Sequence, residues 1–471
     1  MDEVKRGSAE LELVRLLGRD RVLSEASDLT AFSMDTYRQS ELIDFKKMPD
    51  FAVMPVTTAE VVGIVEVASK YGLPIIPKGG GSNRTGMLVP LDGGILIDTV
   101  RMNHVIEVSK PGLSVTVQPG ITLADLERQL DAFGLTLNQE QGSFRMATVG
   151  GSISTSGFSR KHQKYGAISN RVMSLEVVLS DGRVLRTGPK TLYTSTGYRL
   201  QDLFIGSEGT LGIITEATLR VEPIPEARAA VLAFYDEYWA AFSAAEALMG
   251  SPVNFVGAEA YEIPDPERYG APIEKKGIFY VLFDGIEAEV AAEKAFVEKL
   301  IDDTGGLLGQ SDVAKTLITK YVAQFCGARA STGAEDVITS YVPLARSKEF
   351  YDELWNRIIP KYGGSPVPGE ALSLDVGRYR IQGARFFLPK GDGWWERYQM
   401  ILREVAKLVT GLGGTISACH GVGIEHRDLL VYEYSPVCLD AMRSIKQVLD
   451  PNNIMNPGKM IPRPEMSSGQ N

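Results

Sequence analysis

A run of three glycines is the first feature of this sequence that could bind a ligand. It lies in Pro77-Lys78-Gly79-Gly80-Gly81-Ser82-Asn83-Arg84-Thr85-Gly86. Successive glycines permit positive φ angles, so several N–H groups can turn inward and form a nest suited to the oxygens of a pyrophosphate. An ordinary glycine-rich connection between strands is the alternative. A Rossmann fingerprint would run into a helix, whereas residues 94–97, Gly-Ile-Leu-Ile, predict a strand. We therefore interpret the run as a cofactor loop of another kind.

Two further runs of small residues follow in the same half of the chain. Residues 148–157, Thr-Val-Gly-Gly-Ser-Ile-Ser-Thr-Ser-Gly, carry no charge and little bulk. Such a segment would let a planar ligand lie against the main chain; a tight β-bend is the alternative. Residues 206–216, Gly-Ser-Glu-Gly-Thr-Leu-Gly-Ile-Ile-Thr-Glu, lead into a predicted strand. Three such runs in one segment predict a single extended ligand.

These runs belong to a set of six motifs that resembles the FAD-linked oxidases of the vanillyl alcohol oxidase and p-cresol methylhydroxylase superfamily. The nearest branch contains the glycolate oxidase large subunit, D-lactate dehydrogenase and alkylglycerone-phosphate synthase. The motifs, in order, are residues 77–85, Arg101-Met102-Asn103, Val117-Gln118-Pro119-Gly120, Ala147-Thr148-Val149-Gly150-Gly151, residues 206–215, and residues 450–459. The resemblance implies an α+β fold, with a two-part FAD-binding domain of the vanillyl alcohol oxidase type and an α+β cap that holds the substrate.

The resemblance also implies which residues contact the cofactor, FAD. The predicted cofactor-binding residues are Pro77, Lys78, Gly79, Gly80, Gly81, Ser82, Asn83, Thr85, Gly86, Pro119, Thr148, Gly150, Gly151, Ser154, Gly157, Tyr165, Gly166, Glu208, Gly209, Gly212, Ile213, Ile214 and Asn456. We expect non-covalent attachment, because residues 80–83 contain neither histidine nor cysteine. Cys326 and Cys419 are the alternatives for a covalent bond.

His420 is the predicted catalytic base. It lies in Ala418-Cys419-His420-Gly421-Val422-Gly423, which is similar to the family's active-site His-Gly-Val/Ile-Gly. Oxidation of an alcohol by a flavin needs a group that takes the hydroxyl proton, and an imidazole with a pKa near 6.5 is suited to this. A histidine that only bonds the flavin or the backbone is the alternative. The other three histidines, at positions 104, 162 and 426, are predicted to be structural or solvent-facing.

Arginines are the candidates for binding a substrate carboxylate or phosphate, because the guanidinium can bind two oxygens at once. Arg329 is the leading candidate, since the resembled enzymes carry a substrate-binding arginine just ahead of a stretch like residues 339–343. Arg378, beside Tyr379, and the nearby Arg380 and Arg385 form a second basic cluster, and we include Arg378 and Tyr379 among the catalytic residues. A solvated surface charge is the alternative for each arginine.

The cap departs from its family at the metal site. Many D-2-hydroxyacid dehydrogenases of this branch carry H-x-G-D-G-N-x-H, whose histidines hold a divalent ion. Residues 375–384, Asp-Val-Gly-Arg-Tyr-Arg-Ile-Gln-Gly-Ala, contain no histidine. We therefore predict a site without metal, in which Arg378 or Arg380 replaces the cation. Activity that chelation removes and zinc restores would refute this hypothesis.

The predicted function is FAD-dependent oxidation of a small alcohol or 2-hydroxyacid by hydride transfer to flavin N5. One alternative is a non-redox flavin transferase like alkylglycerone-phosphate synthase, which has a similar His-Gly-Val-Gly and a similar Thr339-Ser340. Two of that enzyme's three consecutive histidines are absent, because Ala418 and Cys419 precede His420. Another alternative is a flavin subunit that passes electrons within a complex.

Composition sets the remaining limits. The 471 residues are too many for one core and predict two domains. A net charge of −10 argues against a nucleic-acid partner. No apolar run is long enough to span a membrane, and the start, Met-Asp-Glu-Val-Lys-Arg, has no signal core, so we expect a cytoplasmic protein. The expected partners are a small-molecule substrate, dioxygen or another electron acceptor, and a second copy in a homodimer.

The elements that would position these residues follow from periodicity and turn signals. We predict a helical segment at residues 1–50, with Leu11, Leu13, Leu16 and Leu17 on its apolar face, an FAD domain at 51–223, a cap at 224–410 and a returning segment at 411–471. In the FAD domain we predict helices at 58–71 and 121–133, and a hairpin that turns at Ser180-Asp181-Gly182. In the cap, strands are predicted at 229–234 and 278–283, and helices at 237–249 and 288–304.

Overall fold

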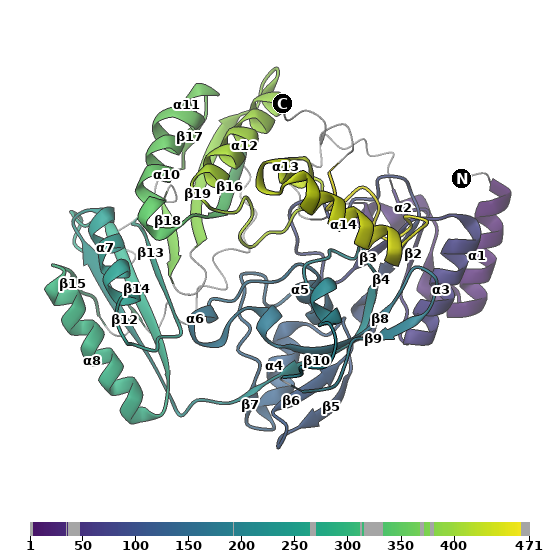
Figure 1. Cartoon of the computed structure of the whole chain (residues 1–471), viewed down its shortest axis with the longest axis horizontal. Helices are drawn as coiled ribbons and strands as arrows, with labels where there is room; N and C mark the ends of the chain where they lie inside the picture. Colours follow the sequence, from purple (N-terminus) through teal and green to yellow (C-terminus); the bar gives the residue numbers. More distant parts are fainter. Residues whose placement is uncertain are drawn as a thin grey trace.

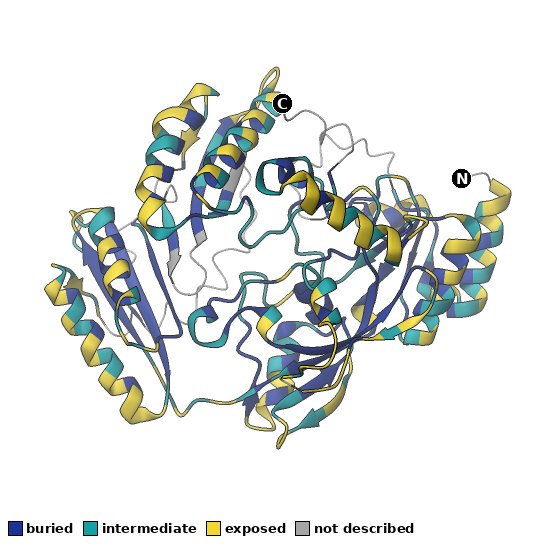
Figure 2. Cartoon of the chain, in the orientation of Figure 1, coloured by how far each residue is buried: buried dark blue, intermediate teal, exposed yellow. Residues whose placement is uncertain are grey.

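The computed structural model describes residues 3–33, 35, 48–191, 193–263, 270–310, 313–314, 333–367, 372–376 and 381–462. A first part, residues 3–223, carries the three glycine runs on two sheets. A second part, residues 227–411, is built on one large sheet, and a C-terminal segment, residues 412–462, crosses back over the first part (Figure 1). The strands of both parts are largely buried, and the helices expose their outer faces (Figure 2).

The first sheet has the order β1-β2-β4-β3. Strands β2 (Phe51–Val53), β4 (Ile95–Asp98) and β3 (Ile75–Lys78) are parallel. Helix α3 (Thr58–Tyr71) connects β2 to β3. The Thr57 hydroxyl accepts the Glu60 N–H at its start, and Gly72 ends it with φ of 66°. Because β3 runs directly into the glycine run, the sheet fixes where that loop begins.

The second sheet has the order β5-β6-β10-β8-β9 and is antiparallel. Its strands are β5 (Val105–Ser109), β6 (Ser114–Val117), β8 (Val172–Val178), β9 (Val184–Arg186) and β10 (Ile213–Arg220). Helix α4 (Leu123–Asp131) places Leu123, Leu126 and Leu130 in the core of this sheet. The short helices α5 (Val149–Ser154) and α6 (His162–Tyr165) and the pair β7 (Leu135–Thr136) and β11 (Glu222–Pro223) complete the first part.

The sheet of the second part has the order β15-β12-β14-β13-β18-β19-β16, and β17 pairs with β19. Its strands are β12 (Ala227–Tyr235), β13 (Gly257–Glu262), β14 (Gly277–Gly285), β15 (Leu307–Leu308), β16 (Gly333–Tyr341), β17 (Ser365–Pro366), β18 (Ser373–Val376) and β19 (Ile381–Pro389). Helices α7 (Tyr238–Met249), α8 (Glu287–Asp303), α10 (Ser347–Glu353), α11 (Ile359–Lys361) and α12 (Trp394–Gly411) lie on its outer side (Figure 1). The other face of the sheet is thereby turned toward the first part.

The C-terminal segment contains α13 (Leu430–Glu433) and α14 (Pro436–Leu449) and ends on the first sheet. The Ile75 N–H donates to the Ile454 carbonyl at 2.7 Å, and the Asn456 N–H donates to the Ile75 carbonyl at 2.8 Å. These bonds attach the end of the chain to β3, the strand that leads into the glycine run.

Three local expectations differ from the structure. Leu11 is 62% exposed, because α1 (Glu3–Leu17) turns Ala9, Leu13 and Leu17 toward the core. The N-terminal segment is not only helical, since β1 (Val22–Leu23), which precedes helix α2 (Ala26–Leu29), pairs with β2. The alternative of a β-bend at residues 148–157 is wrong, because residues 149–154 form helix α5.

Candidate active site

The first two glycine runs lie against each other, and glycine is required where they meet. A Cβ atom on Gly80 would lie 1.8 Å from the Met146 carbonyl oxygen, and one on Gly79 would lie 2.3 Å from Thr148 Oγ1. On the other side of the second run, a Cβ on Gly150 would lie 2.5 Å from Pro119 Cβ. Any side chain would force these backbones apart. The two runs therefore form one surface, as the single-ligand prediction requires.

The third run joins the same surface through main-chain hydrogen bonds. The Gly206 N–H donates to the Ile153 carbonyl at 2.9 Å, and the Glu208 N–H donates to the Ser154 carbonyl at 2.8 Å. Gly209 has φ of 71°, and a Cβ there would lie 2.9 Å from Pro77 Cγ. All three runs predicted to bind one ligand are therefore contiguous.

The loop that carries His420 is fixed to the glycine run of residues 79–86. Asn83 Nδ2 donates to the His420 carbonyl at 3.0 Å. The Thr85 carbonyl accepts the Ile424 N–H at 2.9 Å, and a Cβ on Gly423 would lie 2.1 Å from that oxygen. The predicted base and the predicted pyrophosphate loop are thus immediate neighbours, although 337 residues separate Asn83 from His420.

The His420 ring is oriented by the second part of the molecule. Thr339, on β16, places its Oγ1 3.0 Å from His420 Nδ1. Beside the ring is a small recess whose lining has a polar and an aliphatic portion. The polar lining residues are Arg84, Thr339, His420, Glu425 and His426, and the aliphatic ones are Ile338, Leu402, Val405, Ile416 and Leu429. The recess therefore brings polar and aliphatic side chains together beside the His420 ring.

Several predicted site residues lie on this surface, and others have a partner elsewhere. Lys78 Nζ pairs with Asp98 Oδ2 at 2.6 Å, and the Tyr165 hydroxyl donates to Asp284 Oδ1 at 2.7 Å, in the second part. Gly166 has φ of 78° and lies against Asn170. Ile213 and Ile214 are buried at the start of β10. The predicted substrate residues Arg329, Arg378, Tyr379 and Arg380 lie outside the described residues.

Two buried groups of the site have pKa values shifted by their surroundings. Burial raises the pKa of the Glu208 carboxyl to about 7, although the N–H groups of Val422 and Gly423 act against that rise. Burial lowers the pKa of the Lys459 ammonium, whose Nζ donates to the Val89 carbonyl at 2.8 Å, to about 7. Both values result from the exclusion of water around residues 206–209 and 456–459.

His426 lines the recess. The sequence pattern does not place it in the site and predicts a structural or solvent-facing histidine. Burial lowers its pKa to about 4, so the ring is neutral at neutral pH. Its Nδ1 lies 3.0 Å from the Gly421 carbonyl, which ties it to the loop of His420. Glu425 accepts a bond from the Tyr398 hydroxyl at 2.7 Å. The sequence signal that could have placed Glu425 and His426 in the site is that both follow His420 within six positions.

Two unused groups test whether the surface fits a dinucleotide. The N–H groups of Gly79, Gly80 and Gly81 have no acceptor among the described residues. Asn456 donates through Nδ2 to the Glu208 carbonyl, but its buried Oδ1 accepts no bond in the described part of the chain. Unused donors suit pyrophosphate oxygens, and an unused buried acceptor suits a ring N–H. The residues therefore fit FAD.

Comparisons with known proteins agree with this geometry. Residues 49–188 match the family described as FAD binding domain, and residues 385–460 match the family described as FAD linked oxidases, C-terminal domain. The chain is 30% identical over 441 residues to D-lactate dehydrogenase of Archaeoglobus fulgidus, covering 91% of this chain and 96% of that protein. It is 28% identical over 466 residues to glycolate oxidase subunit GlcD of Bacillus subtilis, covering 96% of each.

Solved structures show the same fold at low identity. p-Cresol methylhydroxylase superposes with a TM-score of 0.80 at 18% identity, covering 98% of each chain. Alkyldihydroxyacetonephosphate synthase superposes with a TM-score of 0.79 at 20% identity, covering 96% of this chain and 84% of the other. Both likenesses extend over the two parts of the molecule, which confirms the predicted α+β fold of an FAD-binding domain with a cap.

The fold, the contiguous glycine runs and the matched families define an FAD-dependent oxidoreductase. The chain belongs to the FAD-linked oxidases of the vanillyl alcohol oxidase and p-cresol methylhydroxylase superfamily. The predicted family and the predicted cofactor, FAD, are confirmed. Among the described helices, none is both long and apolar enough to cross a membrane. Within the same residues, no three His, Cys, Asp or Glu side chains gather as metal ligands would.

Proposed function

We propose that this protein oxidises the CH–OH group of a small alcohol or 2-hydroxyacid, with His420 as the base. The observation that carries the proposal is the contact of the His420 loop with the glycine run of residues 79–86 through Asn83 and Thr85. FAD supplies the hydride acceptor, N5 of its ring. The hydroxyl proton passes to His420 as the C–H hydride leaves, and the substrate becomes a ketone or aldehyde.

Thr339 supports this role for His420. Because Thr339 Oγ1 lies 3.0 Å from Nδ1, we assign proton transfer to Nε2, the other ring nitrogen. A hydrogen bond at Nδ1 holds the tautomer and the ring orientation, as a base that acts in one direction needs. The proposed FAD contacts are the residues predicted from sequence, in the three runs and at Asn456.

Arg84 supports an anionic substrate such as a 2-hydroxyacid. It lies in the glycine run and lines the recess beside His420, where a guanidinium can bind a carboxylate through two hydrogen bonds. The two relatives named above are, by name, a D-lactate dehydrogenase and a glycolate oxidase subunit. We propose the same substrate class here. Arg84 thus joins Arg329 and Arg378 as a candidate for the carboxylate.

Transient flavin reduction tests the proposal. Purified protein is mixed anaerobically with 2-hydroxyacids, phenolic alcohols and acyl-glycerone phosphates while flavin absorbance is followed. We expect 2-hydroxyacids to bleach the flavin, and we expect His420→Gln to slow bleaching at least about 100-fold, as loss of general base catalysis does. His104→Gln is the matched control, because His104 is exposed and bonds only Gln118 among the described residues. An unchanged rate in His420→Gln would exclude His420 as the base.

The same experiment separates a second candidate function, a non-redox transferase like alkyldihydroxyacetonephosphate synthase. The observation that favours it is the contact of Thr339 with His420, which joins the two stretches that resemble that enzyme. A transferase makes no net redox change. Bleaching by a hydroxyacid or phenolic alcohol would therefore argue against it, and consumption of an acyl-glycerone phosphate without bleaching would favour it.

A further inference from the structure

Glu208 has an arrangement that contact with the cofactor does not explain. Its side chain is buried, and its backbone is left-handed with φ of 55°, a conformation that a residue with a side chain adopts at some cost. Its carbonyl accepts Asn456 Nδ2 at 2.8 Å and its N–H donates to the Ser154 carbonyl at 2.8 Å. The main chain at Glu208 is therefore fixed on both sides, and its carboxylate points in one direction.

The carboxylate of Glu208 is directed at the loop of His420. Its Oε1 accepts the Val422 N–H at 2.6 Å, and its Oε2 accepts the Gly423 N–H at 2.9 Å. Gly421 and Gly423 have φ of 78° and 56°. The consecutive N–H groups of Val422 and Gly423, in a loop with two left-handed glycines, form a nest for an anion. The anion in this nest is the side chain of Glu208.

The fit around this contact allows little movement. A Cβ on Gly421 would lie 2.3 Å from Met87 Cε and 2.7 Å from Glu208 Oε1. Both carboxylate oxygens are used, one by each N–H. When the carboxyl is ionised, these bonds are charge-assisted and therefore stronger and shorter than neutral ones. The loop of His420 therefore has a third attachment to the first part, besides Asn83 and Thr85.

We propose that Glu208 is a positioning residue for His420, whose loop it holds at the cofactor surface by binding the N–H groups of Val422 and Gly423. Its role as a predicted contact of FAD is then secondary. The inference rests on the proposed function in one respect, namely that His420 acts on the substrate. The attachment of the loop itself is independent of what His420 does.

Hydrogen–deuterium exchange of the apoprotein, measured by mass spectrometry on peptides spanning residues 418–425, tests the attachment. We expect Glu208→Gln to speed exchange at Val422 and Gly423 about tenfold, because its amide retains one acceptor and presents a donor to the second N–H. Glu208→Asp, which keeps the charge and tolerates a left-handed backbone, should restore part of the protection. Unchanged exchange at these two residues in Glu208→Gln would overturn the inference.

Glu127→Gln is the matched control. Glu127 is a half-buried glutamate that accepts two backbone N–H groups, those of Leu137 and Asn138, at 3.1 and 3.0 Å. Both N–H groups donate to one oxygen, Oε1, which the glutamine amide retains, so the variant should keep the protection of Leu137 and Asn138 and leave residues 418–425 unchanged. If it speeds exchange at residues 418–425, general loosening explains the effect and the inference fails.

Flavin reduction then connects the attachment to catalysis. With FAD added to saturation, we expect Glu208→Gln to have an unchanged KM and a kcat about tenfold lower, since the base is present but displaced. Glu208→Asp should recover part of kcat. A rise in KM without loss of kcat would contradict a positioning role. If His420→Gln reduces flavin at the normal rate, the proposed function fails, while the exchange result still decides whether Glu208 holds the loop.

Discussion

His426 and His420 line the same recess but differ in what surrounds them. His420 bonds a threonine of the second part, whereas His426 bonds a carbonyl of its own loop, that of Gly421. The charged groups near His426 are Arg84, Glu433 and Glu425, whose Oε2 lies 3.6 Å from Nε2. Burial outweighs the two carboxylates and keeps the ring neutral.

This neutral histidine predicts a pH dependence of stability. The pKa of His426 is about 4 in the folded chain and about 6.5 when unfolded. Below pH 6.5 the unfolded state binds the proton first, so the free energy of unfolding falls as the pH drops to 4, by about 3 kcal/mol in total. Urea unfolding at several pH values should show this loss, and His426→Gln should reduce it. His104→Gln should not; an equal reduction there would contradict the assignment.

At the level of single residues, the sequence predicts which side chains could do chemistry better than it predicts their hydrogen-bond partners. His420 and Asn456 are prominent because their motifs are distinctive. The hydrogen bond between Glu208 and Val422 could not be predicted from the sequence, because 214 residues separate them. The sequence also does not distinguish a buried glutamate from an exposed one. Arg329 and Arg378 lie outside the described residues, and their roles stay predictions.

Among the elements, those with local end signals were predicted well and those held by tertiary contacts were not. Helix α3 spans residues 58–71 as expected, since Thr57 caps it and Gly72 ends it. Helix α5 was not expected, because its sequence Val-Gly-Gly-Ser-Ile-Ser has poor helix propensity. Burial of Val149 and Ile153 in the core stabilises it instead. The predicted role of that run as a ligand surface does not depend on the helix.

The contact between the glycine runs predicts an effect on cofactor binding. In Gly80→Ala the new Cβ would lie 1.8 Å from the Met146 carbonyl oxygen, so the loop of residues 79–86 must move. Overpacking of this kind costs about 1–3 kcal/mol, and we expect FAD affinity to fall about 10- to 100-fold, measured by titrating the apoprotein. Gly391→Ala, where nothing lies within 4 Å, should bind FAD normally. Equal affinities in the two variants would contradict the loop assignment.

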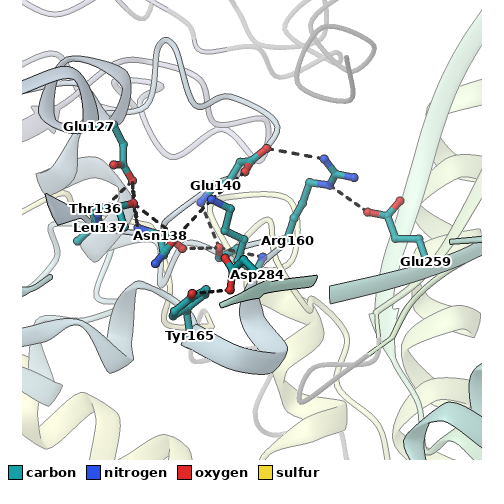
Figure 3. A network of polar contacts seen from close by, with 11 residues as sticks. Glu127, Thr136, Leu137, Asn138, Glu140, Arg160, Tyr165, Glu259 and Asp284 are labelled. Carbon is teal, nitrogen blue, oxygen red and sulfur yellow. Dashed lines mark hydrogen bonds and ion pairs between the residues drawn. The ribbon is translucent and has the colours of Figure 1, made fainter. Parts of the chain in front are cut away.

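At the scale of the whole molecule, the active site needs both parts, because Thr339 comes from the second part and Asn83 from the first. A network of buried polar residues holds the two parts together (Figure 3). Arg160, from the first part, donates through Nε to Glu259 at 3.1 Å and through a terminal nitrogen to the Tyr280 hydroxyl at 2.5 Å. A Cβ on Gly257 would lie 2.0 Å from the Arg160 carbonyl oxygen, so the backbones also touch.

Removal of Arg160 should destabilise the molecule by more than the loss of its hydrogen bonds alone, because its partner Glu259 keeps a buried charge. Arg160 and Glu259 are both buried, and loss of one partner leaves an unpaired charge without water, which costs about 3–5 kcal/mol. We expect Arg160→Met to lower the free energy of unfolding by that amount and to lower kcat, because the Thr339 contact to His420 then loosens. The double variant Arg160→Met with Glu259→Gln removes both charges and should recover most of the stability.

Lys299→Met, which breaks an exposed pair with Asp303, should leave unfolding and kcat unchanged. If Arg160→Met behaves like Lys299→Met, Arg160 does not hold the two parts together, and other contacts must keep Thr339 beside His420.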